Sequence, residues 1–416
     1  MPFSDLTKQV LTPSPYADYF NFVNQCERNP YTSEHPERPV LMSVAECILN
    51  YPLFLENYPK YTELHHGDNE YSSYHGRTYL VESVAKFLTK YAWKSYINPE
   101  NIVCTCGSAA AMELLACCVC NKGDGVLVIS PAYVAFQRDI TMRTQTAMYF
   151  ADTQPDNYKI TETVLESCYQ RACQEGHKPT MLVYTNPANP MGVTYTKDEM
   201  DIVYNFAIKY DLHIFSDEVY ALSIDHETCN YISFAKYLED KPIKDNVTML
   251  WGLSKDFGLS GFRFTTLFTH NETLLKAMKT VNLYYEVPSV AQTVISNMLN
   301  DEEYINEHFK RHEARVNEAR HNMQSFFDRN SIPYAKSSAT FFLWIDLSKY
   351  MKENTFEAEM DLWRYLAADC GVVLSPGRCF FSEAPGWYRI VFTINTPEVT
   401  MIGLNRMMEG LNKLEL

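Results

Sequence analysis

The segment WGLSKDFGLSGFR, residues 251–263, combines long cationic side chains with a glycine-rich, flexible backbone. Lys255 lies just after the apolar run VTMLW (247–251), and Arg263 closes the segment. Lysine is rarely fully buried without a partner. Lys255 is therefore either a solvated loop residue or a reactive amine, and the rest of the chain must decide between them.

Other short apolar runs resemble the one before Lys255 and predict a sheet. Continuous apolar runs are typical of strands that are covered on both faces. Helical segments, such as 77–92, 107–120 and 197–210, alternate with them, which favours an α/β fold with a large, doubly wound and mainly parallel sheet. The expected strands are GVLVIS (125–130), TMLVYT (180–185), LHIFSD (212–217) and VTMLW (247–251).

The pattern changes after about residue 290 and predicts a second domain. A long charged helix (303–329) precedes two strand-like segments, 341–347 and 387–394. The first 45 residues are rich in Pro, Tyr and Asn, so we expect an arm with little regular structure that packs with the second domain. The predicted organisation is an arm (1–45), a large cofactor-binding domain (46–290) and a small α+β domain (291–416).

Composition and charge exclude several classes of protein. The 416 residues are 46% hydrophobic and 21% charged, which is typical of a globular chain. A formal net charge of -15 argues against nucleic acid or an anionic membrane as a partner. The sequence begins with no basic and apolar leader, and no apolar run approaches the roughly 18 residues that span a bilayer. We therefore expect a cytoplasmic protein.

Five of the twelve cysteines crowd into residues 104–120, as CTC followed by CCVC. No second cluster lies at the spacing of a zinc finger or zinc ribbon. We expect reduced thiols that pack as small apolar side chains, and no metal site.

Polar residues follow each predicted strand. In open α/β sheets, ligands bind outside the carboxyl ends of the strands. Taken singly, each residue has an ordinary explanation: NPANPMG is a turn sequence, Asp217 suits a helix cap, and Lys255 suits solvent. The residues concerned are Tyr133, Asn186, Asn189, Gly192, Asp217, Tyr220, Lys255 and Arg263.

Together, these residue types match one cofactor. A lysine amine forms a Schiff base with an aldehyde, and a buried carboxylate keeps a ring nitrogen protonated. An amide and a phenol bind a phenolic oxygen, while an aromatic face stacks on the ring. An arginine and a helix N-terminus hold a phosphate. These are the requirements of pyridoxal 5′-phosphate (PLP).

In these motifs the chain resembles the class I/II aminotransferase family, fold type I of the PLP enzymes, and the resemblance runs from about residue 39 onward. Its motifs are most similar to the 1-aminocyclopropane-1-carboxylate (ACC) synthase branch. The resemblance implies that Lys255 carries the cofactor, Asp217 pairs with the ring nitrogen, and Tyr220 binds the phenolic oxygen. It implies further cofactor contacts from Gly107, Ser108, Ala109, Tyr133, Asn189 and Arg263.

The same resemblance implies a substrate site and a partner. Arg389, in PGWYRIVF, matches an arginine that binds the substrate carboxylate through a bidentate fork. Glu46 and Ala45, in VAE (44–46), fall at the branch's substrate position. Tyr74 matches a tyrosine that reaches the cofactor of the neighbouring subunit, which implies a homodimer with a shared active site.

Three departures from the family fall near these positions. Gly252 replaces a serine, which removes one hydroxyl contact to the phosphate, worth roughly 1–2 kcal/mol. Cys47 and Ser43 replace an asparagine and a glycine beside the substrate pocket. The expected function is that of an ACC synthase-like enzyme, which converts S-adenosylmethionine to ACC and methylthioadenosine. An aminotransferase, a C–S lyase or γ-replacement enzyme, and a catalytically silent binding protein stay open as alternatives.

Overall fold

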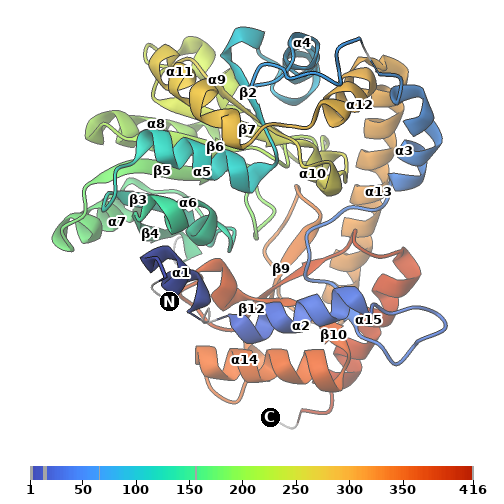
Figure 1. The fold of residues 1–416 in the computed structure, drawn as a ribbon. Helices are drawn as coiled ribbons and strands as arrows, with labels where there is room; N and C mark the ends of the chain where they lie inside the picture. The colour runs from blue at the N-terminus through green and yellow to red at the C-terminus, as the bar shows by residue number, and fades with distance from the viewer. Residues whose placement is uncertain (1–2, 13–15, 65, 155–156, 415–416) are drawn as a thin grey trace.

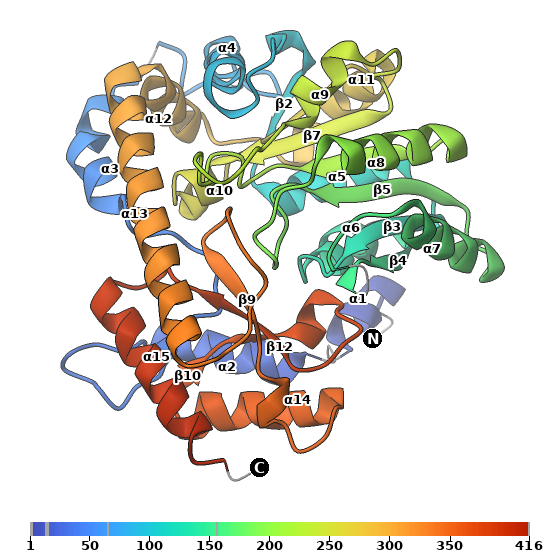
Figure 2. The same ribbon diagram turned by 180° about the vertical axis from the view of Figure 1, so that it is seen from behind.

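A computed structural model describes residues 3–12, 16–64, 66–154 and 157–414. The chain forms a larger body around a seven-stranded sheet and a smaller body below it (Figure 1). A long helix, α13 (Glu302–Arg329), runs along one side of the molecule from the larger body to the smaller one (Figures 1 and 2).

The seven-stranded sheet confirms the predicted fold class. Strand β8 runs antiparallel to both of its neighbours, β2 and β7, while β3, β4, β5, β6 and β7 pair in parallel. The four predicted strands all form within it. In spatial order the strands are β2 (Ile102–Thr105), β8 (Thr265–Thr269), β7 (Val247–Gly252), β6 (His213–Asp217), β5 (Pro179–Thr185), β3 (Gly125–Ser130) and β4 (Ala147–Asp152).

Helices cover both faces of this sheet, which explains the continuous apolar runs. One face is covered by α5 (Ser108–Val119), α6 (Phe136–Thr144) and α11 (Glu272–Val281); the other is covered by α7 (Glu162–Gln174) and α8 (Lys197–Tyr210) (Figures 1 and 2). All six residues of β3 and all six of β7 are buried as a result. The polar residues that follow these strands therefore mark the edge of the sheet.

The smaller body is built on a three-stranded antiparallel sheet in the order β11-β12-β9. Backbone N–H groups of Ser338 and Ala339 donate to the carbonyl oxygen of Gly192, which lies in the turn after β5. This contact joins the smaller body to the carboxyl ends of the large sheet. Its elements are β9 (Phe342–Asp346), α14 (Phe356–Arg364), β11 (Ser375–Pro376), β12 (Trp387–Val391) and α15 (Pro397–Leu411).

The expectation of little regular structure before residue 45 was wrong. Two helices form there, α1 (Asp5–Leu11) and α2 (Ala17–Arg28). Helix α2 buries Tyr19, Val23 and Cys26, which lie on one helical face. The Tyr19 hydroxyl lies 2.9 Å from the Ser375 hydroxyl of β11, so this helix packs on the smaller body. The Pro, Tyr and Asn content of the segment had obscured this amphipathic pattern.

Two further contacts join segments that lie far apart in the sequence. Strand β1 (Val40–Leu41) pairs in parallel with β10 (Val372–Val373) of the smaller body. Helix α12 (Ser289–Asn300) packs instead on α4 (Thr78–Phe87), where the hydroxyls of Ser296 and Ser83 lie 2.8 Å apart. Residues 291–300, which the sequence assigned to the second domain, thus lie beside α4.

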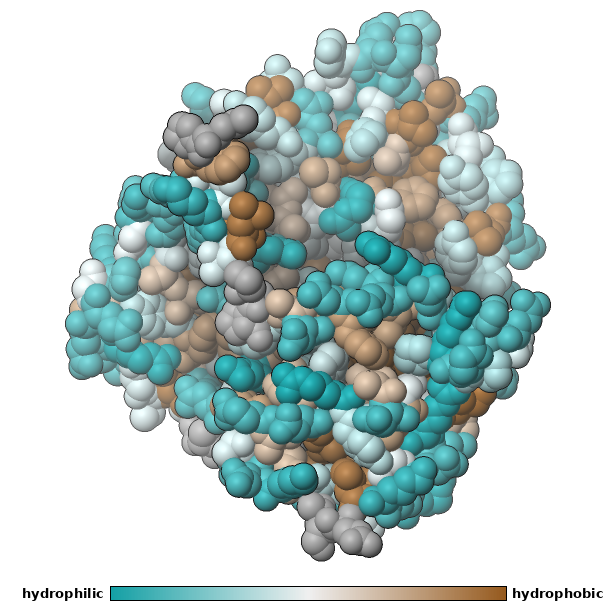
Figure 3. All heavy atoms as spheres, turned by 60° about the horizontal axis from the view of Figure 1, so that its bottom comes forward, coloured by the Kyte–Doolittle hydropathy of each residue, from teal (hydrophilic) through white to brown (hydrophobic). Residues whose placement is uncertain are grey.

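The exterior is mainly hydrophilic on the face seen in Figure 3, with apolar residues scattered among charged ones. None of the described helices is both long enough and apolar enough to cross a membrane.

Candidate active site

A cavity of about 210 Å³ lies where the parallel strands of the large sheet end. Thr185 ends β5, Asp217 ends β6, and Lys255 follows β7. The structure thus brings together eight of the residues singled out in the sequence: Ser108, Ala109, Tyr133, Asn189, Asp217, Tyr220, Lys255 and Arg263.

Lys255 lies in the short helix α10 (Leu253–Asp256), which starts directly after β7. Its Nζ donates a hydrogen bond of 2.7 Å to the carbonyl oxygen of Ala45. Loss of hydration, helped by the nearby positive charge of Arg389, lowers the pKa of Lys255 to about 8. At neutral pH roughly a tenth of this amine is neutral and nucleophilic, far more than for an exposed lysine.

The residue after Lys255 fixes the turn that carries it. The buried carboxylate of Asp256 accepts hydrogen bonds from Trp251 Nε1 (3.0 Å) and Ser223 Oγ (2.8 Å). The Ser223 hydroxyl also lies 2.9 Å from Nε2 of His312, on α13. This network connects the lysine turn to β7, to the segment after β6 and to the long helix, and so restricts the position of Lys255.

Asp217 is a buried carboxylate that faces the cavity. The residue is only 4% exposed, and the Val219 N–H donates to its Oδ1 at 3.3 Å. Burial raises the pKa of Asp217 to about 7, although nearby Lys255 acts to lower it. Burying a carboxylate is costly unless a cation or hydrogen bonds compensate it. A protonated ring nitrogen in the cavity would supply such a cation.

The walls of the cavity carry two phenols and an amide. Tyr220 is 2% exposed and packs edge-on against Phe342 of β9, whereas Tyr133 is half-buried. Arg389 Nη1 donates to Oδ1 of Asn189 at 2.9 Å. Because the amide oxygen is engaged, the Asn189 NH₂ group remains as a donor toward a ligand.

The N-terminus of α5 forms the end of the cavity that suits an anion. Gly107 precedes this helix with φ +102°, and a Cβ there would collide with the guanidinium of Arg263. Glycine therefore allows the arginine to approach the helix end. The first N–H groups of a helix, here from Ser108 and Ala109, have no acceptor within the helix. Helix end and arginine together suit a phosphate.

The structure changes the view of Gly252. Gly252 pairs with Thr265 across β7 and β8, and a Cβ at 252 would lie 2.8 Å from Thr265 Oγ1. The neighbouring strand thus supplies a hydroxyl to the space that a side chain at 252 would occupy. Thr265 Oγ1 lies 3.0 Å from Ser108 Oγ, at the start of α5.

Residues from the smaller body and the arm approach the cavity from the other side. Arg389, on β12, is 6% exposed, and its Nη2 donates to the Ser43 carbonyl oxygen at 2.5 Å. Ser260 Oγ donates to Glu46 Oε1 at 2.8 Å, which holds this carboxylate beside the lysine turn. Ala45 contacts Lys255 through its carbonyl oxygen rather than its side chain.

Tyr74 is the one predicted residue that this chain keeps away from the others. It is 46% exposed and lies against α11, in a shallow pocket with Lys276 and Lys279. Asn282 Nδ2 donates to the Tyr74 carbonyl oxygen. The Tyr74 side chain does not line the cavity of its own chain.

Several residues of the cavity were missed in the sequence. Ser260 lies in the quoted segment itself, so its position was a usable signal. The ion pair of Arg138 with Asp139 (2.9 Å) gave no signal, because its place depends on the packing of α6. Thr265, which is buried beside Ser108 and does not line the cavity, gave none because its place depends on strand pairing. The remaining residues that line the cavity are Met112, Thr185, Val219 and Ser254.

The clustered cysteines differ in how deeply they are buried. All twelve cysteines are free thiols, with Cys104 buried and Cys117 exposed. In the described part of the chain, no group of three or more His, Cys, Asp or Glu side chains is placed to hold a metal ion.

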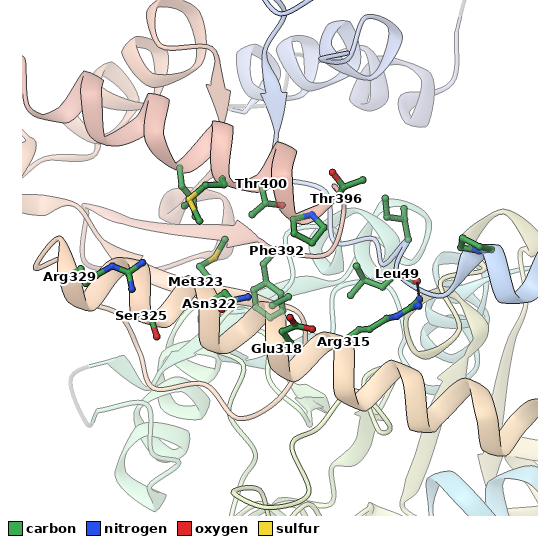
Figure 4. A pocket seen from close by; sticks show the side chains of 16 residues that line it. Leu49, Arg315, Glu318, Asn322, Met323, Ser325, Arg329, Phe392, Thr396 and Thr400 are labelled. Atoms are coloured by element: carbon green, nitrogen blue, oxygen red, sulfur yellow. Dashed lines mark hydrogen bonds between the residues drawn. The ribbon is translucent and has the colours of Figure 1, made fainter. Parts of the chain in front are cut away.

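A larger cavity of about 650 Å³ lies elsewhere, between α13 and α15 (Figure 4). Its wall includes the apolar side chains of Leu49, Met323 and Phe392. None of the predicted site residues lines it. Arg315, at one end, donates to the Leu49 carbonyl oxygen and, at 3.3 Å, to Asn50 Oδ1.

Comparison with known proteins agrees with this geometry. The family described as "Aminotransferase class I and II" matches residues 52–402, and the chain belongs to this family. This is a PLP-dependent family.

Relatives within this family include proteins named as ACC synthases or as ACC synthase-like. The chain is 30% identical over 406 residues to 1-aminocyclopropane-1-carboxylate synthase 11 of Arabidopsis thaliana, covering 94% of this chain and 88% of that protein. It is 32% identical over 353 residues to the human 1-aminocyclopropane-1-carboxylate synthase-like protein 1, covering 82% and 70%.

Among solved structures, Thermus thermophilus aspartate aminotransferase superposes with a TM-score of 0.80 at 18% identity, covering 99% of this chain and 100% of the other. The aromatic aminotransferase of Pyrococcus horikoshii superposes with a TM-score of 0.79 at 19% identity, covering 94% and 99%. These likenesses show the fold.

The residues present fit PLP. The Gly107 position leaves room for Arg263 at the end of α5, which would hold the phosphate. Asp217 is a buried carboxylate that lacks a cationic partner within bonding distance in the described chain, and it would hold the ring nitrogen. Tyr220 and Asn189 would bind the phenolic oxygen, Tyr133 would lie on the ring, and Lys255 would bond to the aldehyde carbon.

Proposed function

We propose that this chain is a PLP-dependent enzyme that acts at Cα of an amino acid, with ACC synthase-like activity. The observation that carries the proposal is that Lys255 and Asp217 line one small cavity whose Asn189 is held by Arg389, in a chain about 30% identical to ACC synthases. When bound, PLP supplies an aldehyde that links covalently to an amine and a ring that withdraws electrons from Cα.

Lys255 has two tasks in this proposal. Its neutral amine attaches the cofactor, and after substrate takes its place the same amine removes the proton at Cα. Burial supports both tasks, because it lowers the pKa of Lys255 to about 8 and so supplies the neutral form near physiological pH. The hydrogen bond to the Ala45 carbonyl oxygen restricts the position of Nζ.

Asp217 would orient the cofactor, and Arg389 would orient the substrate. A cationic ring nitrogen beside Asp217 would keep this carboxylate ionised despite its burial. Arg389 would grip the substrate carboxylate through its guanidinium fork, while its Nη1 also holds the amide of Asn189 at 2.9 Å. One arginine thus links the position of the substrate to that of a cofactor-binding side chain.

In the proposed reaction, the Cα–H bond of S-adenosylmethionine breaks and its proton passes to Lys255. The Cα electron pair then forms a bond to Cγ, and the Cγ–S bond breaks with its electrons on sulfur. The products are ACC, methylthioadenosine and one proton, so atoms and charge balance. Glu46, held by Ser260, would lie beside the reacting chain.

The test mixes the purified holoenzyme with S-adenosylmethionine and measures ACC and methylthioadenosine by mass spectrometry. Both products are expected in equal amounts, and Lys255→Ala should abolish them. If neither product forms, ACC synthesis is rejected. A panel of amino acids with 2-oxoglutarate and pyruvate then distinguishes transamination from elimination, since the former yields a new amino acid and the latter yields ammonia.

We also propose that the working unit is a homodimer with a shared site, in the cytoplasm. Exposed apolar side chains gather near Tyr74, on two neighbouring segments joined by the Asn282–Tyr74 hydrogen bond. Free thiols suit a reducing compartment. The exposed side chains are Tyr71, Leu283, Tyr284 and Val290.

Complementation tests the shared site. Tyr74→Ala and Lys255→Ala homodimers should each be nearly inactive, whereas dissociating and reassociating them together should restore activity, because each mixed dimer has one intact site. A lack of restored activity in mixed dimers whose formation is verified by native mass spectrometry would contradict the shared site.

A further inference from the structure

We infer that Thr265 is a positioning residue for the cofactor phosphate, acting through Ser108. This inference rests on the proposed PLP chemistry and assigns part of it to a residue outside the motifs. The observation behind it is the juxtaposition of three residues from separate elements: Gly252 at the end of β7, Thr265 at the start of β8 and Ser108 at the start of α5.

The place of Thr265 is set by two neighbouring strands. Thr265 pairs with Thr105 of β2 on one side and with Gly252 of β7 on the other. A Cβ at 252 would lie 2.8 Å from Thr265 Oγ1 and 2.7 Å from the Phe264 carbonyl oxygen, closer than van der Waals contact allows. The absence of a side chain at 252 is therefore what lets the threonine hydroxyl occupy this space.

The hydroxyl then reaches the anion site indirectly. Thr265 is fully buried, whereas Ser108, 3.0 Å away, lines the cavity at the N-terminus of α5. A phosphate dianion only accepts hydrogen bonds, so Ser108 must direct its single proton toward the phosphate. Its oxygen is then an acceptor for Thr265 O–H, which fixes the direction of the hydrogen-bonded chain as Thr265 to Ser108 to phosphate.

Such a chain has two physical effects. It holds the Ser108 side chain in the rotamer that faces the ligand, and it polarises the Ser108 hydroxyl so that this group donates more strongly. Thr265 thus offsets a hydroxyl that β7 lacks at Gly252, although it does not itself touch the ligand. The arrangement predicts that removal of either hydroxyl weakens phosphate binding by the same route.

The experiment measures the dissociation constant of PLP from apo-protein by absorbance titration. Thr265→Val keeps the volume of the side chain and removes its hydroxyl, and it should weaken PLP binding roughly two- to tenfold, the usual value of a hydrogen bond between uncharged groups. Thr266→Val is the matched control, because successive side chains of a strand face opposite sides. The control should leave the dissociation constant unchanged.

A double-mutant cycle separates action through Ser108 from independent action. The Ser108→Ala/Thr265→Val protein should bind PLP as weakly as Ser108→Ala alone, since the threonine then has nothing to orient. Losses that multiply instead would overturn the relay. Pyridoxal, which lacks the phosphate, should bind Thr265→Val and wild type equally.

The outcomes also separate this inference from the proposed function. Wild type that binds no PLP rejects the proposed function itself. Wild type that binds PLP, together with Thr265→Val that binds it equally well, rejects only the role of Thr265. Thermal unfolding of each apo-protein identifies a variant that loses binding because it has lost its fold. As a separate control, Thr265→Ser keeps the hydroxyl and should bind PLP with the affinity of wild type.

Discussion

The two cavities of this molecule differ in size and in chemistry. The cavity between α13 and α15 is about 650 Å³ and has an apolar wall, whereas the cavity at the strand ends is about 210 Å³. In the smaller one, burial lowers the pKa of Lys255 to about 8 and raises that of Asp217 to about 7. Volume alone would have selected the cavity that none of the predicted site residues lines. Opposed shifts of an amine and a carboxylate are the better sign of chemistry.

The charged side chains of the two cavities also have different partners. In the larger cavity, Arg315 is engaged with the backbone of Leu49 and holds one part of the fold to another. Lys255, which lines the smaller cavity, and Arg389, which bonds Asn189 of that cavity, also donate to backbone carbonyl oxygens.

Replacement of Lys255 by alanine should have the largest effect. We expect turnover to fall by about 10⁴-fold or more, because both the covalent link to the cofactor and the base at Cα are lost. Borohydride reduction followed by peptide mass spectrometry should show PLP attached at Lys255 in wild type only. As a control from the other cavity, Arg329→Ala should keep turnover within about twofold of wild type; a comparable loss in that variant would erase the contrast.

Asp217→Asn should lower turnover by roughly 10²- to 10³-fold, because a neutral amide no longer keeps the ring nitrogen protonated. The same change should stabilise the apo-protein at pH 8. Burial raises the folded pKa of Asp217 from 3.8 to about 7, so folding binds a proton between these values. The free energy of unfolding therefore falls as pH rises from about 4 to 7 and stays low above 7.

Denaturant unfolding of the apo-proteins measures this effect. We expect Asp217→Asn to be more stable than wild type at pH 8 by about 4 kcal/mol and to lose that advantage below pH 4. An apo-protein pair with the same difference at both pH values would mean that Asp217 is not protonated by burial.

The rate at which apo-protein incorporates PLP should rise about tenfold between pH 7 and 9 and level off above that. Only the neutral amine reacts, and the pKa of Lys255 is lowered from 10.5 to about 8. Stopped-flow absorbance measures the rate, with N-acetyl-lysine amide as the reference amine. A rate that continues to rise through pH 10, as for the reference, would show that burial does not depress this pKa.

Filling the larger cavity should have the smallest effect. Ala319 lines it, and Ala319→Leu should bury added apolar surface and stabilise the protein by about 1 kcal/mol. Turnover and PLP affinity should not change. If turnover changed several-fold while thermal unfolding did not, the α13–α15 cavity would have to be reassigned as a functional site.

Much of the site could be anticipated because local pattern and strand ends carry it. Asp217, Tyr220 and Lys255 follow apolar runs that are buried on both faces, and such runs form the same way in any doubly wound sheet. The helix that starts at Ser108 was visible from its glycine and its apolar length.

The rest depends on contacts between segments that lie far apart in the chain. The role of Thr265 depends on its pairing with Gly252, which no local pattern encodes. The two N-terminal helices were hidden by residues that favour turns, although Tyr19 and its neighbours repeat at helical spacing. Tyr74 lies outside the cavity of its own chain, so its role in the site depends on the proposed homodimer.

The segment that includes residues 43–49 separates anchoring from selectivity. It holds the site through main-chain carbonyl oxygens: Ser43 accepts from Arg389, Ala45 from Lys255, and Glu46 from Thr393. These contacts do not depend on which side chain the segment carries.

Side chains at positions 43 and 47 can therefore be replaced while the lysine and the arginine keep their main-chain acceptors. The restriction falls elsewhere, on Gly258, which has φ +66° and faces the Cys47 carbonyl oxygen so closely that no Cβ fits. Side chains along this segment can therefore vary one at a time, while the glycine opposite must stay.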